Sequence, residues 1–144
     1  MYQITRKNRI KETLQLCHAN GDVACEIDVD LNVDEIAGRV NKAREVLAMA
    51  QNALQKDQDS ASAMEAYGNA VVALFNVLFT EDGTRQMVEF YEGNYTEMLL
   101  DVFPFINNEI IPKIQAASED RKAQLMEAAR LANPGDKGAK RRWR

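Results

Sequence analysis

The feature of this sequence that most constrains its fold is Asn20-Gly21, which lies between two runs of alternating polar and apolar residues. Both central residues of a type I′ turn need a positive φ, which asparagine and glycine tolerate well. A two-residue loop also fixes the strand register. The pairs expected on the apolar face are His18 with Val23, Leu16 with Cys25, Leu14 with Ile27, and Ile10 with Leu31. The other face carries Thr13, Gln15, Ala24, Glu26 and Asp28. The sequence therefore predicts an N-terminal β-hairpin with one apolar face.

The stretch after the hairpin has the features of a long helix. Asn32 is a suitable N-cap, and Glu35 stands at the capping-box position three residues later. Apolar residues then recur at alternating steps of three and four, which indicates one helical face. They are Val33, Ile36, Val40, Ala43, Leu47, Ala50 and Leu54. Because this stripe is narrow and includes alanines, we expect the element that packs on it to approach closely.

A second helix is expected to begin after Asp59 or Ser60 and to run to about Phe79. The polar segment from residue 56 to residue 60 interrupts the first helical pattern. The apolar side of this second helix is formed by Met64, Tyr67, Val71, Leu74, Phe75 and Leu78. The segment Thr80-Glu-Asp-Gly that follows predicts a turn.

Shorter helical segments fill the rest of the chain. Residues 84–92 predict a short helix that ends at Gly93, and Asn94 with Glu97 predicts the cap of another. Pro104 and Pro112 each lack an N–H and clash with the preceding turn, so we expect kinks or short breaks there. From residue 118 to residue 133 the pattern is again helical. Its apolar residues are Leu125, Met126, Ala129 and Leu131.

Together these patterns predict an α+β, mostly α fold, in which an N-terminal β-hairpin is followed by a four- to five-helix bundle. A chain of 144 residues fits one domain. We expect this single domain to cover residues 1–133, because Asn133-Pro134-Gly135 stops the last helix. Residues 134–144 are expected to form a flexible basic C-terminal tail.

Composition and charge narrow the function classes. Residues 134–144 hold five Lys or Arg against one Asp, so residues 1–133 keep 13 of the 18 basic and 21 of the 22 acidic groups. An acidic body does not suit a nucleic-acid-binding domain. No apolar run approaches the ~20 residues needed to span a membrane. No hydrophobic stretch follows the N-terminal charges either, so we expect the protein to stay in the cytoplasm of the cell that makes it.

The acidic segment that starts at Asp28 resembles the beginning of a calcium-binding loop, with oxygen-bearing side chains at every second position. The sixth position of such a loop requires glycine and the twelfth a bidentate glutamate, whereas this chain has Val33 and Arg39 there. We therefore interpret the segment as a solvated strand face that leads into a capped helix, and we expect no metal site and no cofactor.

Groups that could catalyse a reaction are few. Cys17 and His18 are neighbours on a strand, so their side chains should point to opposite faces. The same alternation separates Cys17 from Cys25 and argues against a disulfide. Asp28 and Asp30 share a strand face, but acid–base catalysis needs burial to shift one of the two pKa values, and nothing apolar surrounds them. The sequence therefore predicts a protein that is not an enzyme.

Eight of the ten aromatic residues lie between Tyr67 and Phe105. We expect Tyr67, Phe75, Phe79 and Phe90 to belong to the core of the helical part. The stretch from residue 103 to residue 112 is harder to bury completely, because its apolar side chains fall all around a kinked helix. Either it lies centrally or it offers one side to a partner. The residues expected to contact a partner are Phe103, Phe105, Ile106, Ile110 and Ile111.

From Met87 onward the sequence MVEFYEGNYTEMLLDVFPFINNEIIPKIQAA resembles the C-terminal half of small tail assembly chaperones of long-tailed (siphovirus) phages of Gram-positive bacteria. In that family an acidic and aromatic segment with a glycine turn leads to a proline-interrupted apolar helix. The front is also similar, with a hairpin on a short turn before a long helix. The resemblance covers most of residues 12–132 and consists of packing patterns, and the basic end is not part of it.

The resemblance implies a morphogenesis protein that acts in the cytoplasm of the infected host and is absent from the virion. Such proteins bind the phage tape measure protein, a long apolar helical chain, and keep it soluble before the tail tube forms. The family often makes a second, longer product by ribosomal frameshifting, and this chain would be the short form. Self-association into a homo-oligomer is also expected, since several copies on one client raise avidity.

Two other functions remain compatible with the sequence. A structural adaptor or minor virion component would bind a neighbouring ring of the particle permanently. A small nucleic-acid-binding regulator would use the basic end, where Lys140-Arg-Arg-Trp-Arg combines cations with an aromatic ring. Short terminal charge runs are more often solvated or contact an acidic protein surface.

Overall fold

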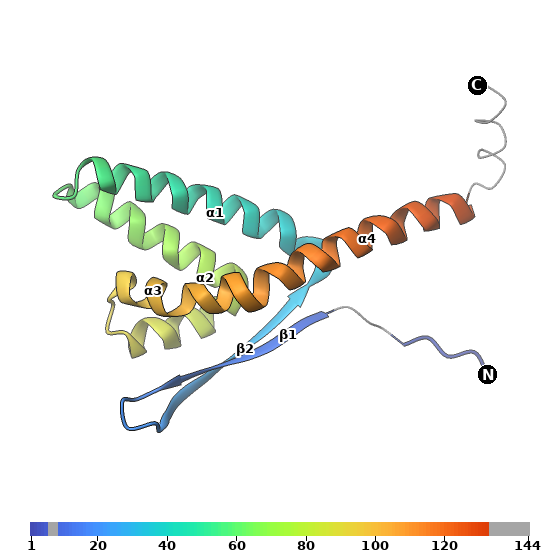
Figure 1. Ribbon diagram of the computed structural model, residues 1–144, viewed down its shortest axis with the longest axis horizontal. Helices are drawn as coiled ribbons and strands as arrows, with labels where there is room; N and C mark the ends of the chain where they lie inside the picture. Colours follow the sequence, from blue (N-terminus) through green and yellow to red (C-terminus); the bar gives the residue numbers. More distant parts are fainter. Residues whose placement is uncertain (6–8, 133–144) are drawn as a thin grey trace.

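The computed structural model describes residues 1–5 and 9–132, which form an α+β, mostly helical fold with an N-terminal antiparallel hairpin (Figure 1). The predicted fold class is confirmed at this level. In chain order the elements are β1 (Arg9–Cys17), β2 (Val23–Asn32), α1 (Val33–Lys56), α2 (Ala61–Phe90), α3 (Tyr95–Phe105), the π-helix η1 (Ile106–Ile110) and α4 (Ile111–Ala132). The predicted flexible tail over residues 134–144 lies outside the described residues.

The prediction of a four- to five-helix bundle is wrong. In the described part of the chain the helices form three columns, because α3, η1 and α4 follow one another without a loop (Figure 1). Pro104 lies inside α3, and Pro112 lies in the first turn of α4. Between them the N–H of Ile111 bonds to the carbonyl of Ile106. The wider π turn leaves room for the Pro112 ring, which would clash with a carbonyl in a regular helix interior.

The second column, α2, contains two segments that were predicted as separate helices with a turn between them. Thr80 has non-helical angles, with φ 66° and ψ 168°, and kinks the helix where the turn is expected. The hydroxyl of Thr80 accepts a hydrogen bond from the N–H of Gly83 at 3.4 Å, as an N-cap would. The expected short helix is thus present as the second limb of α2. The chain then reverses at Glu92 and Gly93, which both have positive φ.

Three of the four predicted hairpin pairs are confirmed. The observed pairs are Ile10 with Leu31, Leu14 with Ile27, and Leu16 with Cys25. The fourth is wrong, because β2 carries one extra residue near the turn and Cys17, not His18, stands opposite Val23. Ala24 is the extra residue of this β-bulge.

The turn differs from the type I′ form because Asn20 bonds locally. Its side-chain oxygen accepts a hydrogen bond from the N–H of Asp22 at 2.9 Å, and its amide nitrogen donates to the Asp22 carboxylate at 3.1 Å. Of the two central residues only Gly21 has a positive φ, of 92°. Such side-chain-to-backbone bonds favour a wider loop, which shifts the pairing by one residue.

The predicted helix starts are confirmed by their caps. Asn32 accepts a hydrogen bond from the N–H of Asp34 at 3.0 Å, and Ser60 accepts one from Ala63 at 3.2 Å. Asn94 caps α3 by accepting from the N–H of Glu97 at 3.2 Å. These bonds satisfy N–H groups that have no partner inside the helix.

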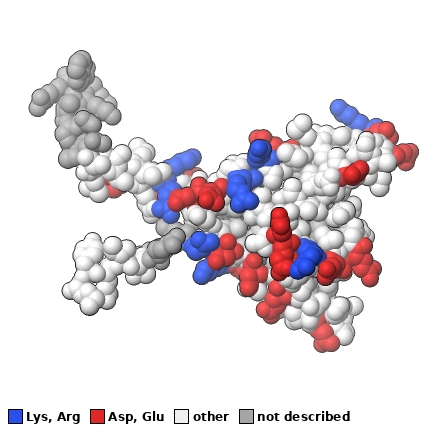
Figure 2. All heavy atoms as spheres, turned by 180° about the vertical axis from the view of Figure 1, so that it is seen from behind, with Lys and Arg blue, Asp and Glu red and all other residues white. Residues whose placement is uncertain are grey.

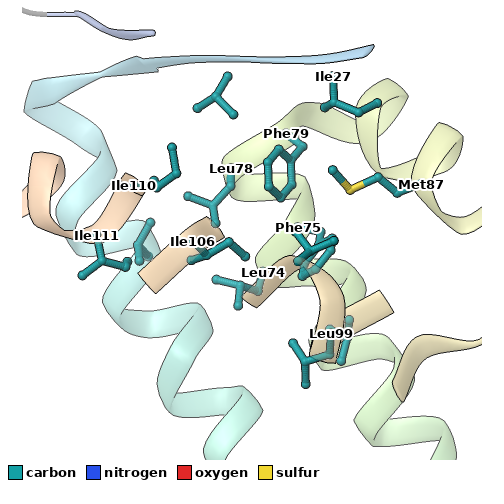
Figure 3. Close-up of a cluster of buried hydrophobic side chains, with 14 of the residues drawn as sticks. Ile27, Leu74, Phe75, Leu78, Phe79, Met87, Leu99, Ile106, Ile110 and Ile111 are labelled. Carbon is teal, nitrogen blue, oxygen red and sulfur yellow. The ribbon is translucent and has the colours of Figure 1, made fainter. Parts of the chain in front are cut away.

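The core lies where α2 passes between the hairpin, α1 and the third column (Figure 3). The apolar stripe of α1 faces inward as predicted, with Ala43 and Leu54 half-buried and the other members buried. On α2, Met64 is an exception to the predicted apolar side, because it lies in the exposed first turns. Phe75 and Phe79 are fully buried, whereas Tyr67 and Phe90 pack at the edge of the core.

By length and composition alone, helix α2 is long and apolar enough to cross a membrane. Core helices of other proteins also pass this test.

Gly83 sets how closely α2 approaches the hairpin. A Cβ at this position would lie 3.1 Å from Cγ2 of Ile27 and 3.3 Å from Cβ of Phe79. Ile27 is itself buried on the inner face of β2. The glycine therefore lets the second limb of α2 cover the apolar face of the sheet.

We expect Ile106→Ala to lower the free energy of unfolding by about 2–5 kcal/mol, because it leaves a cavity at a fully buried position. Chemical denaturation followed by circular dichroism measures the change. Ile4→Ala, at an exposed position before β1, is the matched control and should change stability by less than about 0.5 kcal/mol. Equal stability of both variants would show that η1 is not part of the core.

Candidate partner-binding surface

The five residues predicted to contact a partner do not form one exposed surface. Ile106 and Ile110 are 0% exposed and Ile111 is buried, all within the core that Figure 3 shows. These three isoleucines were predicted to contact a partner. Because they are buried inside the chain, that prediction is corrected: they are core residues. The physical reason is that the π turn keeps the helix continuous, so that its apolar residues face α1, α2 and the sheet together.

Phe103 and Phe105 are half-buried and pack against the edge of the core. The ring of Phe105 stacks on that of Phe79, with centroids 6.4 Å apart and planes at 24°. Each phenylalanine therefore keeps some surface open to a partner, while most of its contacts are internal. A charged substitution at either position would disturb the fold as well as any interface.

The described chain has a larger unpartnered surface on the second half of α4. The first half of α4 is held to the body by Ile111 and Ile114, which are buried, and by an ion pair between Lys113 and Glu12. Arg121 makes the last contact, where its Nε lies 2.8 Å from Oδ1 of Asp34 at the start of α1. From residue 122 to residue 132 every side chain is exposed, and the helix projects from the body (Figure 1).

The projecting half of α4 continues the buried face of the first half. The positions Ile114, Ser118, Arg121, Leu125, Ala128 and Ala132 follow one another at alternating steps of four and three, which places them on one side of the helix. Leu125, which lies on this row, is 63% exposed. Met126 and Leu131, which are 75% and 67% exposed, lie on the two flanks of the helix, about 100° and 120° around it from Leu125. We call Leu125, Met126, Ala128, Leu131 and Ala132 the α4 arm surface.

Polar pairs lie on the back of the arm and on the flank that also carries Leu131. Arg130 donates from Nε to the Glu127 carboxylate at 2.9 Å, and Gln124 donates to Asp120 at 3.2 Å. An apolar row backed by charged residues is the pattern of a helix that packs against something. Within the described chain nothing covers it.

Sequence reasoning identified the apolar residues of this helix but did not identify them as a binding surface. The available signal was the alanine content, because Ala128, Ala129 and Ala132 bury little area and cannot anchor a helix to a core. The proline-flanked stretch has larger side chains, and the partner contact was predicted there instead. Residue size distinguishes the buried segment from the exposed arm here better than total hydrophobicity does.

The charged surface of the body is mainly acidic on the face that Figure 2 shows, where Asp and Glu side chains predominate. A depression of about 460 Å³ over the hairpin is lined by Lys11, Glu12, Thr13, Asp28, Val29 and Asp30. Arg9 donates to Asp30 at 2.6 Å and holds the pKa of that carboxyl below its ordinary value. Charged walls of this kind do not resemble an apolar ligand pocket.

The groups weighed for catalysis lie apart. Asp28 and Asp30 are part of strand β2 and α1 begins at Val33, so the acidic segment is not wound into a metal-binding loop. The His18 ring packs 5.9 Å from that of Phe90, while Cys17 is exposed. Burial, together with the nearby Asp101 carboxylate, raises the pKa of Tyr91 and keeps its phenol protonated. Among the described residues no three His, Cys, Asp or Glu side chains could hold a metal ion.

Comparisons with known proteins gave no relative. No protein-family model, no curated protein and no solved structure matches this chain. The functional argument therefore rests on the surfaces described above.

We expect Cys17 to react with iodoacetamide faster than Cys25. Cys17 is exposed, whereas burial raises the pKa of Cys25 and lowers its thiolate fraction near neutral pH. Mass spectrometry of peptides after timed alkylation at about pH 8 measures both rates. The difference should vanish in denaturant. A faster Cys25 in the folded protein would contradict the inner position of this side chain.

Proposed function

We propose that this chain is a non-catalytic tail assembly chaperone of a long-tailed phage, which binds the tape measure protein and keeps it soluble during tail morphogenesis. The observation that carries the proposal is the α4 arm surface, a group of exposed apolar side chains on a projecting helix that has no partner in the described chain. The resemblance of residues 12–132 to that chaperone family supplies the client.

The chemistry of such a client fits this surface. A very long helical chain exposes apolar stripes before assembly and aggregates through them. A second helix with a matching stripe can cover one of these stripes by side-to-side packing. The alanines of the α4 arm surface allow the two backbones to come close.

A chaperone must also release its client when the tail tube forms. The large side chains of the α4 arm surface are two leucines and one methionine, and its other members are alanines. Burying so few large groups gives a contact of modest strength. Several copies along one client would raise the total affinity without making any single contact slow to break.

The acidic body suits the same role. Its carboxylates repel other copies of the complex and keep a chaperone-coated client in solution in the host cytoplasm. No step of this role needs a reactive group, a metal or a cofactor.

We expect Leu125→Glu to weaken client binding about tenfold or more, because it places a charge in the contact that leucine would bury. The measurement is the soluble fraction of the tape measure protein on co-expression, followed by pull-down with a tagged chain. Leu100→Glu is the matched control, since Leu100 on α3 is 71% exposed and lies outside the α4 arm surface. This control should bind like the unaltered chain.

Three results would count against the proposal. A client that stays equally soluble with Leu125→Glu would exclude the α4 arm surface. A stoichiometric amount of the chain in purified particles, measured by mass spectrometry, would favour a structural adaptor or minor virion component. A gel shift that weakens steeply with salt would instead indicate a small nucleic-acid-binding regulator.

A further inference from the structure

The outer edge of β1 has no partner within the described residues. The sheet has two strands in the order β1-β2, so each strand has one unpaired edge. β1 is nine residues long, and α2 packs against β2 beside it. A long open edge presents a row of free N–H and C=O groups that readily pair with another strand.

One hydrogen bond shows which backbone groups face this edge. The N–H of His18 donates to the carbonyl of Asp22 at 2.8 Å, so the backbone groups of His18 point toward β2. Successive residues of a strand direct their N–H and C=O groups to alternate sides. The groups that point outward therefore belong to the odd-numbered residues of β1: Arg9, Lys11, Thr13, Gln15 and Cys17.

The edge of β2 is protected in ways that the edge of β1 is not. β2 contains the bulge at Ala24, and its outer face carries Glu26, Asp28 and Asp30. Asp82 of α2 adds a further carboxylate beside the strand. β1 contains no proline and no bulge, and its inward-facing Glu12 is neutralised by Lys113. Bulges and charges are the usual protection against edge pairing.

We infer that β1 pairs antiparallel with β1 of a second copy of this chain, with Thr13 on the two-fold axis. This register pairs all nine residues of each strand. The opposed residues are Arg9 with Cys17, Ile10 with Leu16, Lys11 with Gln15, Glu12 with Leu14, and Thr13 with Thr13 of the second copy. The product is a four-stranded sheet in the order β2-β1-β1-β2.

Charge and strand length together select this arrangement, since an axis at Leu14 or at Gln15 opposes no like charges but leaves residues at the start of β1 unpaired. The Thr13 axis opposes no two like charges, and it places the apolar Ile10 against Leu16 on the inner face. An axis at Lys11 or at Glu12 would oppose two like charges and leave residues unpaired. Pairing of β2 with β2 would bring the carboxylates of Glu26, Asp28 and Asp30 from two copies together. The β1 edge is thus complementary to itself.

The test removes one outward N–H and leaves the backbone pairing of the hairpin in place. Thr13→Pro lacks the N–H that would bond across the two-fold axis, the backbone N–H of this residue points away from β2, and proline is tolerated at strand edges. The Thr13 hydroxyl donates to the Asp28 carboxylate at 3.1 Å, and both Thr13→Pro and Thr13→Val remove that bond, so its loss cancels in the comparison. Thr13→Val keeps the N–H and the branched side chain and is the matched control. Analytical ultracentrifugation over a range of concentrations gives the dimer dissociation constant of each form.

The unaltered chain and Thr13→Val should be dimers with similar dissociation constants, and Thr13→Pro should dissociate about tenfold or more readily. Circular dichroism checks that all three are folded. An unaltered chain that is monomeric at every concentration, or a Thr13→Pro dimer as tight as the control, overturns the inference.

Hydrogen exchange of the unaltered chain gives an independent answer if Thr13→Pro does not fold. The amides of Lys11, Thr13 and Gln15 should exchange slowly in concentrated solution and quickly on dilution. The even-numbered amides of β1, which bond to β2, should be protected at both concentrations. Fast exchange of the odd-numbered amides in a confirmed dimer would place the interface elsewhere and reject β1 pairing.

Discussion

The fold depends on the contact between the apolar face of the hairpin and the second limb of α2. A two-stranded hairpin is at best marginally stable in water, so its inner face must be covered. Gly83 allows that close cover, because a Cβ there would lie only 3.1 Å from Cγ2 of Ile27 and the isoleucine side chain would have to shift. The kink at Thr80 directs the second limb toward the sheet, and the remaining helices pack around the same core.

Local chemistry in the sequence predicted most of the elements. Asn-Gly identified the hairpin, and the caps at Asn32, Ser60 and Asn94 identified three helix starts, because these residues bond to neighbours that are close in sequence. The predictions that differ from the structure concern places where a local preference competes with another local bond or with tertiary packing. The Asn20 side chain bonded to its neighbour and widened the turn. Pro104 and Pro112 were expected to cause kinks or short breaks, and the chain instead stays helical through both, with a π turn between them.

The candidate binding surface was harder to predict than the fold. Large apolar side chains such as Ile106 and Ile110 indicate burial, but a sequence does not show whether the burial is within the chain or against a partner. The structure shows where the body ends, at the contact of Arg121 with Asp34. The heptad spacing of α4 runs through that boundary unchanged, so the spacing does not distinguish the arm, and the alanine content was the local signal that did.

The continuity of α4 has a mechanical consequence. The exposed arm and the buried isoleucines belong to the same rigid column, which passes through η1 into α3. A ligand that tilts the arm must therefore displace Ile111 and Ile114 or bend the helix near Arg121. Either movement carries an energetic cost in the interior, so occupancy of the arm and stability of the interior are thermodynamically linked.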